Sequence, residues 1–226
     1  MNEFFEQHRF GATVRACRAL RHEFATPLSA AVLHFELARR AAVRASGDVP
    51  ERLRASLETG RKQLDEAVEL LEGFSALGRA HEGEPGLVDF AALVSRVAES
   101  IRPELKTRSL SFLMEGPSRG IYVDGFEDEI EGATREVVLT AARWAAPGEG
   151  LVEIGSDAAM AYVLVRLPLE GARPGETLFR ARSRPGAGIG PWLARWAFEA
   201  NAGRVESEDD GANLTVTASL PQVALS

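Results

Sequence analysis

The stretch Arg21-His22-Glu23-Phe24-Ala25-Thr26-Pro27-Leu28 lies inside the first long helical segment of the 226-residue chain. Thr26 follows His22 at helical spacing, so the two side chains are expected on one face of the helix. Pro27 has no N–H to donate to the carbonyl of Glu23, so we expect the helix to bend beside His22. A neutral imidazole is a nucleophile, and an adjacent carboxylate can orient it and take up its proton. The stretch therefore predicts that His22 accepts a phosphoryl group.

The same residues, read as His-Glu-x-x-Thr-Pro-Leu, resemble the phospho-accepting box of the dimeric two-component histidine kinases. The resemblance implies that His22 is phosphorylated, that Glu23 assists the transfer, and that Thr26 serves dephosphorylation of the partner regulator. Ala25 stands where the family often has a basic residue. A lone helical histidine is more often a surface residue, and only the complete box favours a functional role.

Two long amphipathic helices are predicted around this box. From about residue 11 to 45, apolar side chains recur in steps of three and four. They are Cys17, Leu20, Phe24, Leu28, Ala31, Phe35, Ala38 and Ala42. After turn residues at 46–50, a second helix is expected from about Glu51 to Arg79. Its apolar positions are Leu53, Leu57, Gly60, Leu64, Ala67, Leu71 and Phe74. One hairpin cannot bury both seams, so we expect a homodimeric four-helix bundle with His22 outside.

The remainder of the chain alternates predicted strands and helices. Helices are expected near 90–103, 127–145 and 191–201, and strands near 109–114, 151–154, 162–167, 204–207 and 214–220. This order predicts a sheet with helices on one face. The expected fold class is α+β, with a lead-in at 1–10, a phosphotransfer hairpin at 11–82 and a sandwich domain at 83–226. In sequence order the last part resembles the ATP-binding domain of histidine kinases.

Three glycines carry part of that resemblance. Gly186, Gly188 and Gly190 precede a predicted helix and resemble the last glycine box of the family. Glycines let backbone amides approach a phosphate near a helix N-terminus, so these are the candidate cofactor-binding residues. Phe179 stands where the family carries an aromatic residue in its lid region.

Other nucleotide-binding positions depart from the family pattern. Thr140 replaces the asparagine that would hold magnesium, although Glu136, one turn earlier, can approach a metal or water. Leu167 replaces the aspartate that accepts the adenine amino group, and Leu169 replaces a glycine. An unpaired polar group costs about 1–3 kcal/mol, so ATP is expected to bind weakly or not at all. No metal ligands are assigned.

Composition narrows the remaining possibilities. The net charge of −7 and the pI of about 5.3 disfavour non-specific nucleic-acid binding. Cys17 is the only cysteine, which excludes an internal disulfide and fits a reducing cytoplasm. No apolar run approaches the roughly 18 residues of a membrane span, and the N-terminus lacks signal-peptide features. We therefore expect a cytoplasmic protein that binds neither membrane nor nucleic acid.

These observations favour a histidine phosphotransferase derived from a histidine kinase. His22 would exchange a phosphoryl group with aspartates of response-regulator receiver domains, and no cofactor would be required. Two alternatives stay open. The first is an active soluble histidine kinase with a divergent ATP site, which would need ATP and magnesium. The second is a non-catalytic module that binds a regulator, so whether the protein is an enzyme stays undecided at this point.

Overall fold

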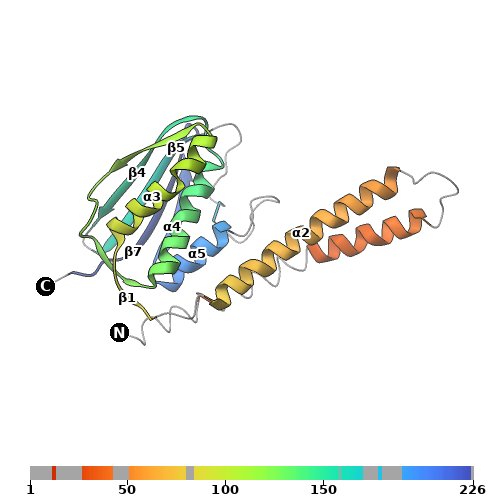
Figure 1. Cartoon of the computed structure of the whole chain (residues 1–226), viewed down its shortest axis with the longest axis horizontal. Helices are drawn as coiled ribbons and strands as arrows, with labels where there is room; N and C mark the ends of the chain where they lie inside the picture. The colour runs from red at the N-terminus through yellow and green to blue at the C-terminus, as the bar shows by residue number, and fades with distance from the viewer. Residues whose placement is uncertain are drawn as a thin grey trace. The chain divides into compact units, whose positions relative to one another are not determined.

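The computed structural model describes residues 12–13, 27–42, 51–79, 84–157, 159–169, 178–179 and 190–224. The chain divides into two compact units, one formed by Arg15–Arg79 and the other by Met1–Val14 together with Ala80–Ser226. The first unit contains a pair of helices, and the second combines a sheet with helices (Figure 1). Within the described ranges, no helix is both long enough and apolar enough to cross a membrane.

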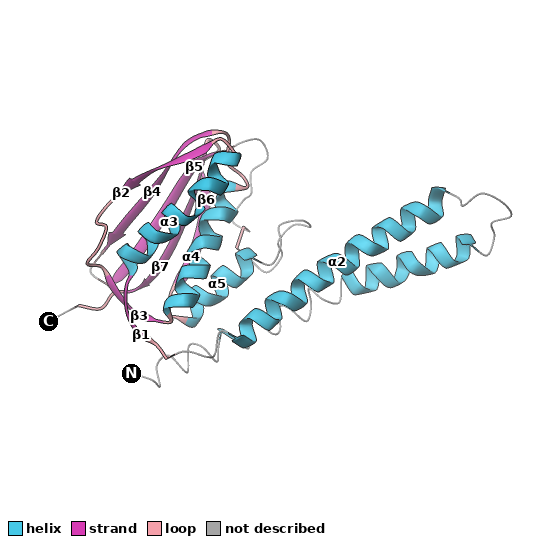
Figure 2. Cartoon of the chain, in the orientation of Figure 1, coloured by secondary structure: helices cyan, strands magenta, loops and turns pink. Residues whose placement is uncertain are grey.

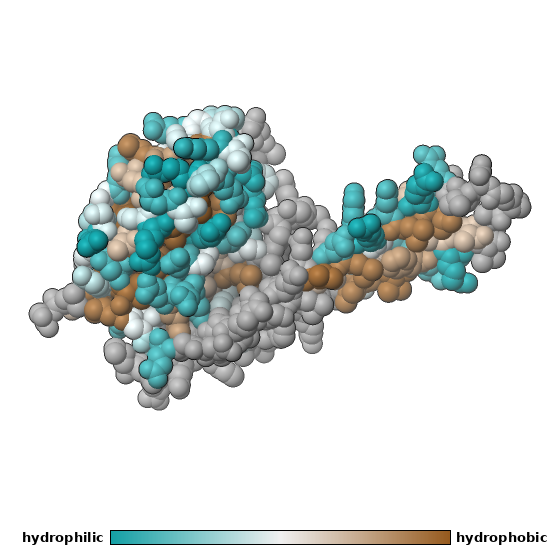
Figure 3. Space-filling view, in the orientation of Figure 1, coloured by the Kyte–Doolittle hydropathy of each residue, from teal (hydrophilic) through white to brown (hydrophobic). Residues whose placement is uncertain are grey.

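The helical unit contains a helix at 27–42 and α2 (Glu51–Arg79), as the sequence predicts. The side chains buried between them are small, because the seam is built from Ala31, Ala38, Gly60 and Ala67. A Cβ added at Gly60 would lie 3.4 Å from Cζ of Phe35, so the helices approach closely there. Larger apolar side chains stay exposed along both helices (Figure 3).

A five-stranded sheet organises the second unit, with strand order β2-β4-β5-β7-β6. Its strands are β2 (Leu110–Glu115), β4 (Gly148–Ser156), β5 (Met160–Pro168), β6 (Arg204–Asp209) and β7 (Asn213–Pro221). The β2–β4 pair is parallel and the other pairs are antiparallel. A separate antiparallel pair joins β1 (Gly86–Asp89) to β3 (Tyr122–Gly125).

Three helices cover one face of the sheet: α3 (Phe90–Thr107), α4 (Glu127–Ala142) and α5 (Gly190–Ala200) (Figure 2). Alternate residues of β5, such as Val163 and Val165, are fully buried, whereas Tyr162 and Leu164, which alternate with them, are partly exposed. This alternation is what a sheet covered on one face requires. The predicted α+β class and the helix-on-sheet layering are confirmed.

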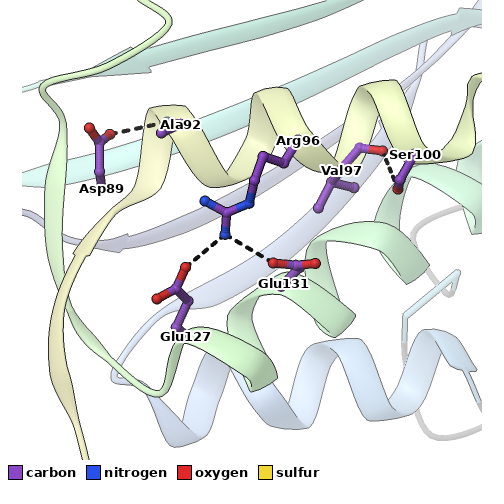
Figure 4. Close-up of polar contacts among 7 residues, drawn as sticks. All are labelled: Asp89, Ala92, Arg96, Val97, Ser100, Glu127 and Glu131. Carbon is purple, nitrogen blue, oxygen red and sulfur yellow. Dashed lines mark hydrogen bonds and ion pairs between the residues drawn. The ribbon is translucent and has the colours of Figure 1, made fainter.

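Polar contacts fix the helices at their ends. Asp89 caps α3 by accepting from the backbone N–H of Ala92 at 3.0 Å (Figure 4). Arg96 of α3 donates to Glu127 at 2.7 Å and to Glu131 at 3.0 Å, both on α4. The hydrogen bonds to Glu131 and Glu127 raise the pKa of Arg96. An exposed cross-helix pair of this kind aligns α3 with α4 but contributes little to stability.

Candidate functional site

The predicted phospho-accepting residues His22, Glu23 and Thr26 lie outside the described residues. The described helical residues of this unit resume at residue 27, directly after this group in sequence. His34, another histidine of the same unit, packs against α2, because a Cβ on Gly60 would lie 3.5 Å from the His34 Cβ. The Nδ1 atom of His34 is buried and has no protein hydrogen-bond partner. This environment fits a packing residue rather than a solvent-facing nucleophile.

The nucleotide-site residues of the second unit meet where α4 ends and α5 begins. The hydroxyl of Thr140 donates to Oε1 of Glu136 at 3.0 Å, since residues four apart on a helix share a face. Arg143, which follows the end of α4, donates from Nη2 to the same oxygen at 3.3 Å. One carboxylate oxygen therefore accepts hydrogen bonds from a hydroxyl and a guanidinium.

Gly190 is the one residue of the predicted glycine box that the structure describes, since Gly186 and Gly188 lie outside the described ranges. It is the first residue of α5. A Cβ added there would lie 2.1 Å from Oε1 of Glu136 and 2.2 Å from its Cδ. The structure therefore places Gly190 directly against the carboxylate of Glu136.

The position predicted to face adenine belongs to the apolar core. Leu167 on β5 is fully buried and pairs across the sheet with Leu214 of β7, which is also fully buried. A Cβ on Gly150 would lie 2.2 Å from Cδ2 of Leu167, so the leucine fills the space beside β4. Phe179 is buried as well.

The described residues of this site do not fit a magnesium nucleotide, whereas Gly186 and Gly188 lie outside the described ranges. Carboxylate and hydroxyl oxygens are suitable magnesium ligands, but Thr140 and Arg143 already donate to the Oε1 atom of Glu136. Across the part of the chain that the structure describes, no three His, Cys, Asp or Glu residues form a metal-binding group. Leu167 offers no acceptor to an adenine amino group.

The sequence reading missed the role of Arg143 at this junction. Glu136, Thr140 and Arg143 follow one another at spacings of four and three, so all three are expected on one helical face. An acidic residue two helical turns before a basic residue could have indicated this contact from the sequence. Their meeting with Gly190 depends on the packing of α4 against α5, which helical periodicity does not predict.

Comparisons with known proteins identify the fold. No protein-family model matches the chain, and no curated protein matches it either. The structure of the Acinetobacter baumannii histidine kinase AdeS matches with a TM-score of 0.58 at 18% identity, covering 90% of this chain and 98% of that chain.

Two further solved structures match a smaller share of the chain. The catalytic domain of histidine kinase ThkA matches with a TM-score of 0.54 at 14% identity, covering 62% of this chain and 98% of that chain. The mycobacterial sensor histidine kinase MprB gives 0.53 at 22% identity, covering 63% of this chain and all of that chain (100%). At these identities the likeness establishes the fold. The second unit has the fold of a histidine-kinase ATP-binding domain.

Proposed function

We propose that the protein is a histidine phosphotransferase of a two-component phosphorelay, which passes a phosphoryl group between receiver domains through His22. Two observations support the proposal. The sequence keeps His22, Glu23 and Thr26 of a phospho-accepting box, and Thr140 and Arg143 donate to the chain's own Glu136 where a nucleotide is expected in the family it resembles. A relay needs a nucleophile and a docking face, but it needs no nucleotide.

In the proposed transfer, every bond and proton is accounted for without a cofactor bound to this chain. One ring nitrogen of His22 attacks the phosphorus of a phosphorylated receiver aspartate, and the P–O bond to that aspartate breaks to leave a carboxylate. The other ring nitrogen then gives its proton to Glu23, which leaves a neutral phosphohistidine. Attack by the carboxylate of a second receiver breaks the P–N bond, and the proton returns from Glu23 to the ring.

The proposed active form is a homodimer. The small seam residues bring the two helices of one hairpin together but leave large apolar side chains exposed on one flank of each helix. On the helix at 27–42 these are Leu28, Val32 and Phe35, and on α2 they are Leu57, Leu64 and Val68. Contiguous apolar surface of this kind marks an association site, and a second hairpin would bury both flanks.

The helix at 27–42 carries a second exposed apolar pair, which we assign to the receiver domain. Leu33 and Leu37 are 58% and 44% exposed and lie on the opposite side of the buried Ala31 and Ala38 from the dimer flank. The helical periodicity expected from the sequence gives them a common face with His22, with Leu33 about three turns and Leu37 about four turns away. A receiver that reaches His22 must cover an area of roughly 800 Å², so its footprint extends along this face.

Phosphotransfer from a labelled receiver tests the proposal. The full chain is incubated with a receiver domain carrying ³²P on its aspartate, and label on the chain is measured with its acid and base stability. We expect acid-labile label on the wild type and on His34→Ala, and none on His22→Ala. Glu23→Gln should slow the transfer by about 10²–10⁴-fold, and Thr26→Ala should reduce only loss of phosphate to water. Label on His22→Ala would refute the proposal.

The second candidate is an active histidine kinase, and the fold of the second unit favours it. Incubation with labelled ATP and magnesium separates the two functions. Label that reaches His22 from ATP at a rate comparable to transfer from the receiver would replace the relay with the kinase. Receiver binding without any label on either protein would favour the non-catalytic module.

A further inference from the structure

We infer that the α4–α5 junction is closed by the chain's own Glu136–Arg143 pair, and that Gly190 is required there to admit the Glu136 carboxylate rather than a nucleotide phosphate. The inference concerns the second unit alone and does not depend on the role of His22. It assigns to Glu136 the place of an internal anion at the start of α5.

The first argument is steric. A Cβ on residue 190 would lie 2.1, 2.2 and 2.8 Å from Oε1, Cδ and Cγ of Glu136. Cβ atoms do not approach other heavy atoms this closely, so only glycine accepts the carboxylate in its present position. Any larger residue at 190 would turn the Glu136 side chain away from the hydrogen bonds that it receives from Thr140 and Arg143.

The second argument is electrostatic. The first turn of a helix carries a partial positive charge, which favours an anion beside it. Glu136 already supplies that anion at the first residue of α5. A phosphate would therefore have to displace the Glu136 carboxylate from this position. Arg143 already provides a cation to this carboxylate.

The strength of the ion pair is not what closes the junction. The side chains of Glu136 and Arg143 are 23% and 39% exposed, and a partly exposed pair is weak. Closure follows from where the carboxylate lies. The decisive experiment must therefore test the contact between Glu136 and Gly190, not the removal of Arg143 alone.

A double-mutant cycle tests this contact in the full chain. Gly190→Ala is measured in the wild type, in Glu136→Ala and in Glu136→Gln by denaturant unfolding. We expect Gly190→Ala to raise the unfolding equilibrium constant in the wild type and in Glu136→Gln, because glutamine keeps the shape of the side chain. In Glu136→Ala this effect should shrink by about threefold or more. Equal effects of Gly190→Ala in all three backgrounds would overturn the inference.

Calorimetry with ATP and magnesium tests the closure itself. The wild type is expected to show no binding at micromolar nucleotide. Micromolar binding to the wild type, with Glu136 in place, would overturn the closure even if the cycle shows coupling. Because neither measurement involves phosphotransfer, their failure is distinguishable from failure of the proposed relay.

Discussion

Leu28 and Leu37 provide a matched test of the proposed dimer. They are the same residue type on one helix, and their side chains are 43% and 44% exposed in the single chain. At about 100° per residue, Leu28 lies about 70° to one side of the direction midway between the buried Ala31 and Ala38, and Leu37 about 110° to the other. A bundle of two hairpins therefore buries Leu28 and leaves Leu37 in solvent.

The expected magnitude follows from the exposed fraction. Full burial of a leucine side chain contributes about 1.5–3 kcal/mol, so burying the remaining 43% of Leu28 contributes about 0.6–1.3 kcal/mol per copy. Two copies enter one dimer, so Leu28→Ala should weaken dimerisation by about tenfold to seventyfold. Leu28→Glu should weaken it further, because an ion buried without a partner costs several kcal/mol. Leu37→Ala and Leu37→Glu should leave the dimer affinity unchanged.

Analytical ultracentrifugation over a concentration series measures the dissociation constants of the wild type and of these variants. Circular dichroism of each variant checks that the helices remain folded. The reasoning fails if the wild type is a monomer at micromolar concentration, or if Leu37→Glu dissociates the dimer as strongly as Leu28→Glu. Leu37→Glu should instead raise the KM for a phosphorylated receiver while leaving the dimer intact.

Two further predictions concern residues outside the proposed phosphotransfer. Asn201 is fully buried and accepts a hydrogen bond from the backbone N–H of Phe126 at 2.9 Å. Asn201→Ala should therefore lower the free energy of unfolding, measured by chemical denaturation, by about 1–3 kcal/mol. An unchanged free energy of unfolding would contradict this role. Hydrogen bonds from Arg39 and Arg40 lower the pKa of Glu36 from 4.5 to about 2. Because folding lowers the pKa of this carboxyl group, its ionised form stabilises the helix above about pH 4.5, and this stabilisation is lost as the pH falls toward about 2. NMR titration should therefore show a low pKa for Glu36, and this pKa should rise in Arg39→Ala.

Local pattern predicted the long elements well. The bounds of α2 agree with the sequence, because turn residues precede it and its apolar positions recur at helical spacing. The end of α3 was predicted too early, at Pro103. The helix continues to Thr107 because Leu105 is buried in the core. Pro103 cannot donate a hydrogen bond to the carbonyl of Glu99, but Glu99 is exposed, so water can reach this carbonyl.

Short strands that pair across long sequence distances were not predicted. β1 and β3 have four residues each and pair from Gly86 with Gly125 to Asp89 with Tyr122. Four residues are too few to establish an alternating pattern, and the partner lies beyond α3 in sequence. β4 was predicted from Leu151 but begins at Gly148, where pairing with β2 outweighs the low strand propensity of glycine.

The candidate site could be predicted only in part, because some of its contacts join residues that lie far apart in the sequence. The box around His22 is a local pattern, and its function stays a prediction. Glu136 was expected to approach a metal or water, and the structure shows that it accepts from Thr140 instead, whereas the approach of Gly190 depends on tertiary packing. From sequence, a glycine before a helix is equally consistent with a bound phosphate and with a close side chain.

The roles proposed for Glu136 and His22 together specify the source of the phosphoryl group. A site built for ATP leaves charges that the nucleotide and its metal compensate, so such a domain depends on its ligand for part of its stability. In this chain the carboxylate of Glu136 is compensated by Thr140 and Arg143 without a ligand. If the junction is closed in this way, a phosphohistidine at His22 requires a donor other than ATP bound to the same chain. A phosphorylated receiver aspartate supplies that donor, which is why closure of the α4–α5 junction and relay through His22 are consistent proposals.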